Sequence, residues 1–158
     1  MSTTVRVPTA DTGDGSHWAQ LIESSPVGYA FVDSESRVKA ANDALCQLFG
    51  MSKSELVGRE ILSLIFPDDV ERVTELADRS ATGLAIASWR ARYVRADGSV
   101  FWGQFTIAPT FDSGGDFIGT GGSIVDVTDE VDAVTELADS ERKFRMLASN
   151  TGDLVLWI

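Results

Sequence analysis

The sequence contains little cysteine, histidine or positive charge, and each shortage excludes a class of function. Among 158 residues there are one Cys and one His, too few for an intramolecular disulfide or an ordinary Cys/His zinc site. Lys and Arg total 13 against 24 Asp and Glu, so the formal net charge is −11. This acidity argues against a nucleic acid as partner and against binding to an anionic membrane surface.

Long apolar runs are also absent. The longest stretch without a formal charge, Gly98–Phe111, is too short to span a bilayer. The chain does not open with a basic segment followed by an apolar one, as a signal peptide would. We therefore expect a soluble, cytoplasmic protein. With 44% apolar residues, the chain can build the core of one ordinary domain.

The pattern of apolar residues predicts an α+β domain. Alternation of apolar and polar residues predicts strands at 28–33, 37–41, 84–95, 100–111 and 117–127. Capping residues and helical spacing predict helices that begin near Ser16, Asn42, Ser52, Pro67 and Asp129. Residues 1–15 are rich in Thr, Gly and Asp, which predicts a disordered tail. This order of elements indicates one sheet with helices packed against it.

Several short motifs occur together in a recognisable order. They are Pro26-Val27-Gly28, Ala41-Asn42, Phe49-Gly50, Glu55-Leu56-Val57-Gly58, Phe66-Pro67-Asp68-Asp69, Arg95-Ala96-Asp97-Gly98-Ser99 with Trp102, and Asp126-Val127-Thr128. In this order and at this spacing they resemble a PAS domain with its C-terminal PAC segment, across residues 16–128. The resemblance implies the PAS fold: a five-stranded antiparallel sheet with short helices packed on one face, an N-terminal cap helix and a C-terminal linker helix.

The C-terminal segment has two interpretations. Residues 129–148 are expected to form a helical linker. A shift of 126 residues aligns the segment at 18–21 with that at 144–147, so residues 149–158 resemble the truncated start of a second PAS domain. The alternative is a helix–strand tail that docks on the first domain.

The resemblance implies a regulatory sensor of bacterial type and not an enzyme. PAS domains pass a signal to an output module; a histidine kinase or a cyclic-di-nucleotide enzyme, outside this chain, would fit. The sequence itself has no phosphate-binding Gly-rich loop. Its one His, His17, lies near the N-terminal tail, so the usual Ser–His or Cys–His pairing that activates a nucleophile is missing.

Flavin is disfavoured as a cofactor. Flavin-binding relatives carry a reactive Cys and a Gln where this sequence, aligned on the family motif, has Ile61 and Ile65. The positions whose amides would read the flavin ring hold Tyr93, Gly103 and Ile124. Apolar groups there would leave the polar groups of the ring unpaired, which is costly.

Haem is disfavoured for a similar reason. Haem-binding PAS domains use a His on their long helix, and the corresponding helix of this chain has none. His17 lies near the N-terminal tail, where we interpret it as an exposed residue at the start of a helix. Cys46 has apolar neighbours, so we interpret it as buried packing rather than as an iron ligand.

An apolar pocket between sheet and helices is the remaining candidate site. Its predicted walls are Tyr29, Phe31, Leu45, Cys46, Phe49, Ile61, Leu62, Ile65, Trp89, Ala91, Tyr93, Phe105, Ile107 and Ile124. One interpretation is that these side chains simply fill the core. The other is that they hold a fatty acid or another small hydrophobic ligand, with a Tyr hydroxyl as polar anchor.

The signalling end of the domain is expected at Asp126 and Thr128. In the family these two residues tie the linker helix to the sheet, so that movement of the sheet reaches the helix. A homodimer is expected as well, with the candidate interface residues Trp18, Leu21, Trp102, Val131 and Val134. The alternative to a ligand sensor is a ligand-free PAS module that only dimerises and relays.

Overall fold

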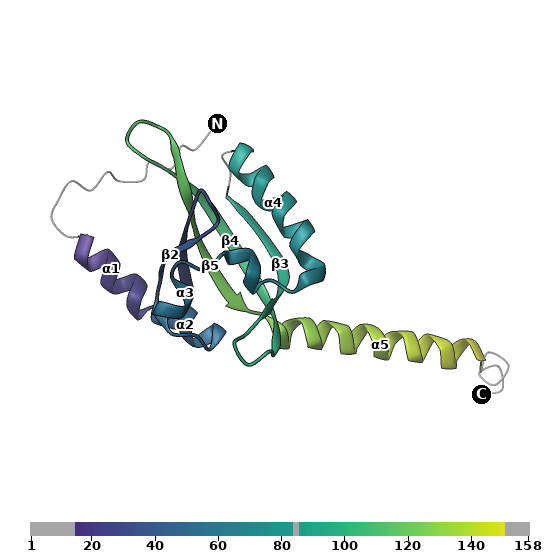
Figure 1. Cartoon of the computed structure of the whole chain (residues 1–158). Coiled ribbons are helices and arrows are strands. Elements are labelled where there is room, and N and C mark those ends of the chain that lie inside the picture. The colour runs from purple at the N-terminus through teal and green to yellow at the C-terminus, as the bar shows by residue number, and fades with distance from the viewer. Residues whose placement is uncertain (1–14, 84–85, 151–158) are drawn as a thin grey trace.

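The computed structural model describes residues 15–83 and 86–150, which are built around one antiparallel sheet (Figure 1). The sheet has five strands in the order β2-β1-β5-β4-β3. These strands are β1 (Gly28–Asp33), β2 (Val38–Ala41), β3 (Ala87–Val94), β4 (Val100–Phe111) and β5 (Phe117–Asp126). The last strand therefore occupies the centre of the sheet, between the first and the fourth.

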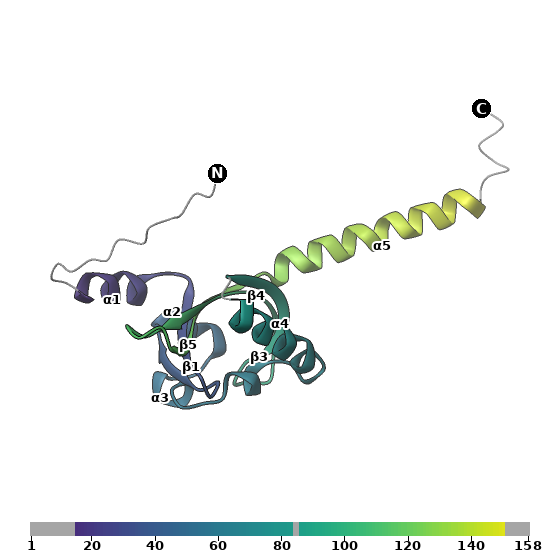
Figure 2. The same cartoon turned by 90° about the horizontal axis from the view of Figure 1, so that it is seen from above.

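Most of the helices are short and lie between β2 and β3 in the sequence. The helical elements are α1 (Gly15–Ser24), α2 (Asp43–Phe49), α3 (Lys53–Leu56), the 3-10 turns η1 (Ile61–Leu64) and η2 (Pro67–Asp69), α4 (Val70–Gly83) and α5 (Thr128–Asn150). Figures 1 and 2 show that α1 and α5 extend away from the body on opposite sides. None of the described helices is long and apolar enough to cross a membrane.

The core is an aromatic cluster that joins α2 to the edge of the sheet. Phe49 of α2 meets Tyr93 and Phe101 edge-on, with ring centroids 6.0 and 5.5 Å apart. Tyr93 stacks on Phe101 at 5.5 Å, and Trp89 meets Phe105 edge-on at 5.4 Å. Such edge-on and offset arrangements are the favoured geometries of aromatic pairs. The cluster therefore fixes α2 against β3 and β4.

Two glycines allow the strands to pack closely. Gly119 has φ +151°, and a Cβ there would collide with the carbonyl oxygen of Val32 on the neighbouring strand. Gly103 faces the core, where a Cβ would lie 2.7 Å from Cε2 of Tyr93. The Tyr93 ring thus lies directly over Gly103.

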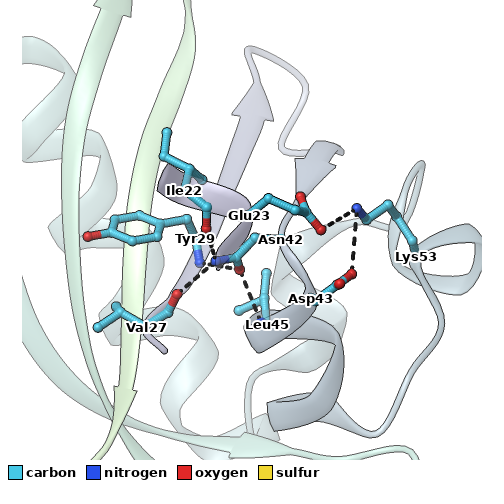
Figure 3. A network of polar contacts seen from close by, with 8 residues as sticks. All are labelled: Ile22, Glu23, Val27, Tyr29, Asn42, Asp43, Leu45 and Lys53. Atoms are coloured by element: carbon cyan, nitrogen blue, oxygen red, sulfur yellow. Dashed lines mark hydrogen bonds and ion pairs between the residues drawn. The ribbon is translucent and has the colours of Figure 1, made fainter. Parts of the chain in front are cut away.

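A buried amide fastens the segment between α1 and β1 to the core (Figure 3). The side chain of Asn42 donates to the carbonyls of Ile22 at 2.7 Å and Val27 at 2.9 Å. Its oxygen accepts from the backbone N–H groups of Tyr29 and of Leu45, the latter as the cap of α2. All the hydrogen-bonding capacity expected of a buried amide is used here, so α1 is held at its C-terminal end.

The predicted α+β class and five-stranded antiparallel sheet are confirmed. β1 and β4 have the bounds that the apolar pattern predicts, whereas β3 begins only at Ala87. Residues 84–85 of the predicted third strand, 1–14 of the predicted tail and 151–158 of the predicted second repeat lie outside the described residues. Gly15 belongs to α1, and residues 149–150 belong to α5.

Candidate functional site

An inner cavity lies between the sheet and the helices that cover it. Its volume is about 140 Å³. Side chains of β1, β3, β4 and β5 form one wall, and η1 and α4 form the other. The lining includes Ala30, Val32, Ile61, Leu62, Ile65, Val73, Ala77, Trp89, Tyr93, Phe105, Ile107 and Phe117. The cavity is therefore largely apolar, as ligand sites in proteins usually are.

The structure divides the predicted pocket residues into three groups. Those that line the cavity are Ile61, Leu62, Ile65, Trp89, Tyr93, Phe105 and Ile107. Leu45, Phe49, Ala91 and Ile124 are buried in the core, and Cys46 is half-buried against it, without lining the cavity. The third group, Tyr29 and Phe31, lies on the other face of the sheet.

The predicted pocket is wrong at Tyr29 and Phe31, which do not line the inner cavity. Successive side chains of a strand point to opposite faces, and in β1 the inward positions belong to Ala30 and Val32. Tyr29 and Phe31 instead line an open groove on the outer face of the sheet, together with Ile22 of α1. A Tyr29 hydroxyl therefore cannot anchor a ligand in the inner cavity.

Sequence reasoning missed the contribution of α4. Val73 and Ala77 line the cavity from this helix, and Leu76 packs against the core beside them. Their spacing of three and four residues places them on one helical face. That spacing was the available signal, but it does not reveal which part of the sheet the helix covers.

Two polar atoms of residues in the lining are fully buried and make no hydrogen bond of ordinary geometry within the described residues. They are the indole Nε1 of Trp89 and the hydroxyl of Tyr93. Burial raises the pKa of the Tyr93 hydroxyl well above its ordinary value, and the Trp89 N–H lowers it by less. That influence indicates that the two groups are near each other. The Tyr93 hydroxyl oxygen can accept a hydrogen bond, so the Trp89 N–H has a possible acceptor beside it, and neither atom is accessible from the cavity.

The residues of the cavity do not fit a flavin. Drug-sized ligands occupy pockets of roughly 300–1,000 Å³, several times the 140 Å³ found here. Ile61 and Ile65 lie in the lining and offer neither a thiol nor an amide.

Metal-binding groups are not gathered in the described part of the chain. No cluster of three or more His, Cys, Asp and Glu side chains occurs there. His17 is exposed on α1, which projects from the body. Burial raises the pKa of the Cys46 thiol, which disfavours the thiolate that a metal would bind.

The second part of the site is the junction where β5 passes into α5. One oxygen of Asp126, Oδ1, accepts from the Thr128 hydroxyl at 2.6 Å and from its backbone N–H at 2.9 Å. The Thr128 hydroxyl oxygen in turn accepts from the N–H of Trp102 on β4 at 3.0 Å. The N–H of Val127 donates to the Trp102 carbonyl at 2.8 Å. The first turn of α5 is therefore tied to both β5 and β4.

Arg95 connects this junction to the rest of the domain. Its guanidinium donates to the other oxygen of Asp126 at 2.8 Å, to the Leu48 carbonyl in α2 at 3.0 Å and to the Ser99 hydroxyl at 3.3 Å. It also lies 4.5 Å from the ring centroid of Phe101. In the sequence Arg95 is recognisable only as part of the motif Arg95-Ala96-Asp97-Gly98-Ser99, because nothing in the sequence pairs it with a residue thirty-one positions away.

The predicted dimer residues fall into two groups. Trp18 and Leu21 of α1 and Val134 of α5 are at least 60% exposed. Trp102 and Val131 are half-buried. The guanidinium carbon of Arg92 lies 5.6 Å from the centroid of the Trp102 ring.

A cavity between an antiparallel sheet and short helices, with a projecting helix tied to the last strand, is typical of small sensory domains. Comparison with known proteins agrees: the sequence profile described as "PAS fold" matches residues 22–132. The chain belongs to the PAS family.

Its relatives are large signalling proteins. The probable diguanylate cyclase DgcE of Escherichia coli is 29% identical over 58% of this chain and 8% of its own length. The C4-dicarboxylate transport sensor protein DctS of Rhodobacter capsulatus is 32% identical over 67% of this chain and 16% of its own. A crystallised PAS domain from Colwellia psychrerythraea, 19% identical, superposes with a TM-score of 0.69 over 72% of this chain and 96% of that domain. The chain thus spans only a small part of its curated relatives.

Proposed function

We propose that this PAS domain senses a small ligand and transmits its occupancy through the Asp126-Val127-Thr128 junction and α5 to an output domain of a cytoplasmic signalling protein. The observation that carries the proposal is the Arg95–Asp126 ion pair, 2.8 Å long. It joins α2 and the β3–β4 hairpin to the residue that caps α5.

The path from cavity to junction is short. Tyr93 lines the cavity, and Arg95 follows it two residues later. A displacement of Tyr93 by a ligand would move the end of β3 and with it the Arg95 guanidinium. Because Arg95 holds Asp126, and Asp126 holds Thr128, the displacement reaches the first turn of α5. A second connection supports this path, since Arg90 of β3 donates to Glu130 of α5 at 3.2 Å.

The relatives support an enzymatic output domain. One curated relative is a probable diguanylate cyclase, and one similar solved structure belongs to a sensory box histidine kinase/response regulator of Burkholderia thailandensis. A cyclase or a histidine kinase is therefore the kind of output we propose. α5 projects away from the body of the domain, as Figure 1 illustrates.

Hydrogen exchange of the Asp126→Ala variant tests the relay. The substitution removes the ion pair and both bonds to Thr128, and a hydrogen bond to a charged group contributes about 1.5–3 kcal/mol when it is buried. Asp126 is partly exposed, so we expect amides in the first turns of α5 to exchange roughly tenfold faster. Amides in the centre of β4 and β5 should keep their protection.

Asp112→Ala is the matched control. Asp112 also caps its own turn, with Oδ1 accepting from the N–H groups of Gly114 and Asp116 at 2.9 Å, but it lies at the far end of the β4–β5 hairpin. Exchange in α5 should not change in this variant. Unchanged exchange of α5 in Asp126→Ala, or equal effects in both variants, would contradict the relay.

A second function, dimerisation and relay without a ligand, is favoured by exposed apolar residues on the projecting helices. Trp18, Leu137, Phe144 and Leu147 are each at least 63% exposed, which is typical of surfaces that meet a partner. Native mass spectrometry distinguishes the two functions. A dimer without bound small molecule would favour the second one, whereas a mass excess lost on denaturation would favour the first.

A further inference from the structure

We propose that Arg92 is a positioning residue that couples the start of α4 to the first turn of α5 through the ring of Trp102. This inference rests on the proposed transmission to α5 and adds a second route, separate from the ion pair of Arg95 with Asp126. Figures 1 and 2 show α4 alongside β3, and this helix forms part of the wall of the inner cavity. A shift of α4 would therefore reach α5 by this route.

The start of α4 is fastened to Arg92. Asp69, the last residue of η2 before α4, is buried. Its carboxylate accepts from Nη2 of Arg92 at 2.7 Å, from Nε at 3.1 Å and from the backbone N–H at 2.8 Å. The N–H of Phe66, just before η2, donates to the Arg92 carbonyl at 2.8 Å. A two-pronged pair of guanidinium and carboxylate fixes the orientation of the guanidinium as well as its position.

The guanidinium held in this way lies against two aromatic rings. Its carbon is 4.4 Å from the ring centroid of Phe66 and 5.6 Å from that of Trp102. Both distances fall within the range of about 6 Å for a cation–π interaction, in which Trp is the strongest partner. Arg92 and Trp102 are paired across β3 and β4, so their side chains project from the same face of the sheet. The guanidinium therefore links the start of α4 to the Trp102 ring.

The backbone of Trp102 holds the first turn of α5. Its N–H donates to the Thr128 hydroxyl oxygen at 3.0 Å, and its carbonyl accepts from the N–H of Val127 at 2.8 Å. The carbonyl of Val127 accepts from the N–H of Val131 at 3.0 Å, which closes the first turn of the helix. A displacement of Trp102 moves both of these anchors, so the Val131 amide is a reporter of the route.

Another contact between β3 and α5 is weaker than this one. Arg90 pairs with Glu130 at 3.2 Å, but the two side chains are 46% and 68% exposed, and exposed ion pairs contribute little. The side chains of Arg92 and Asp69 are 31% and 9% exposed, so water and salt screen their interaction less. The route through Trp102 is therefore the stronger connection of α4 to α5.

Amide hydrogen exchange in a double-mutant cycle tests the coupling. Asp69→Asn removes the charge that holds the guanidinium and keeps the shape of the side chain. We expect Val131 to exchange about two- to fivefold faster, which is the worth of one cation–π contact at a partly exposed site. In a Trp102→Val background the ring is lost and the backbone bonds to α5 remain, so Asp69→Asn should have no effect on this exchange. The effect should return in Trp102→Phe, which keeps an aromatic face.

Val38→Ala is the matched control for general destabilisation. Val38 is fully buried on β2, at the edge of the sheet opposite to β3. Loss of its methyl groups destabilises the domain as a whole and leaves the contacts of Arg92 in place. The exchange of Val131 should therefore stay as it is in the unaltered protein.

Three results would overturn the inference: unchanged exchange of Val131 in Asp69→Asn, the same acceleration with and without the Trp102 ring, or an equal acceleration in Val38→Ala. The proposed function is tested by a different variant, Asp126→Ala. If that variant leaves α5 unchanged while Asp69→Asn acts only through the ring, the proposed junction fails and the Trp102 route stands. The reverse pair of results overturns the Trp102 route alone.

Discussion

Replacement of Asn42 by alanine should destabilise the domain more than the loss of an ordinary helix cap. Asn42 is 2% exposed and its side chain makes four hydrogen bonds to backbone groups. Loss of the cap of α2 costs about 1 kcal/mol. The carbonyl of Val27 and the N–H of Tyr29 are then left without their partner, at about 1 kcal/mol each.

The fourth hydrogen bond, from the Asn42 side chain to the carbonyl of Ile22, contributes less because water can reach this carbonyl. The carbonyl of Ile22 lies at the end of the exposed helix α1, where water replaces the amide. The expected loss for Asn42→Ala is therefore about 3 kcal/mol in the free energy of unfolding. Urea unfolding followed by circular dichroism measures it, with the slope of the transition checked for two-state behaviour.

Two further variants separate the cap from the fastening of α1. Ser52 caps α3 in the same way but is exposed and reaches no distant segment, so Ser52→Ala should cost only about 1 kcal/mol. Asn42→Asp keeps the acceptor for Tyr29 and Leu45 but loses both donors, so α1 should exchange its amides faster while α2 stays capped. A loss below that of Ser52→Ala in the Asn42→Ala variant would refute the reasoning.

The remaining predictions concern a salt bridge and a packed glycine. The Arg92 guanidinium, 2.7 Å from Asp69, lowers the pKa of that carboxyl. Asp69 therefore adds stability above its unfolded pKa of about 4 that is lost as pH falls through the lower folded value. Asp69→Asn should cost about 2 kcal/mol at pH 7 and much less at pH 3 in urea unfolding; an equal cost at both would contradict this. Gly103→Ala should cost about 1–3 kcal/mol by crowding Tyr93, whereas Gly121→Ala, with its nearest neighbour 3.9 Å away, should be nearly neutral; equal melting temperatures of the two variants would refute it.

The order of the elements was predictable because local signals agree along the chain. Alternation in 28–33 and 100–111 marks β1 and β4. Asn42 and Ser52 were predicted as caps from residue type, and both accept the expected backbone N–H. The motif that ends in Asp126 and Thr128 indicated where the sheet meets the linker, since an Asp and a Thr two residues apart can bond within one turn.

The tertiary structure alone decided which face of each strand is buried and which distant groups meet. Both faces of β1 carry apolar side chains, so the sequence of the strand does not show which face is buried. Only the packing of the helices decides that Val32 points inward and Tyr29 outward. The pairing of Arg95 with Asp126 depends on β5 closing beside β4. The inner cavity depends on the packing of η1 and α4 over the sheet. A sequence specifies local conformation through neighbouring residues, whereas a cavity and a relay consist of contacts between residues far apart in the chain.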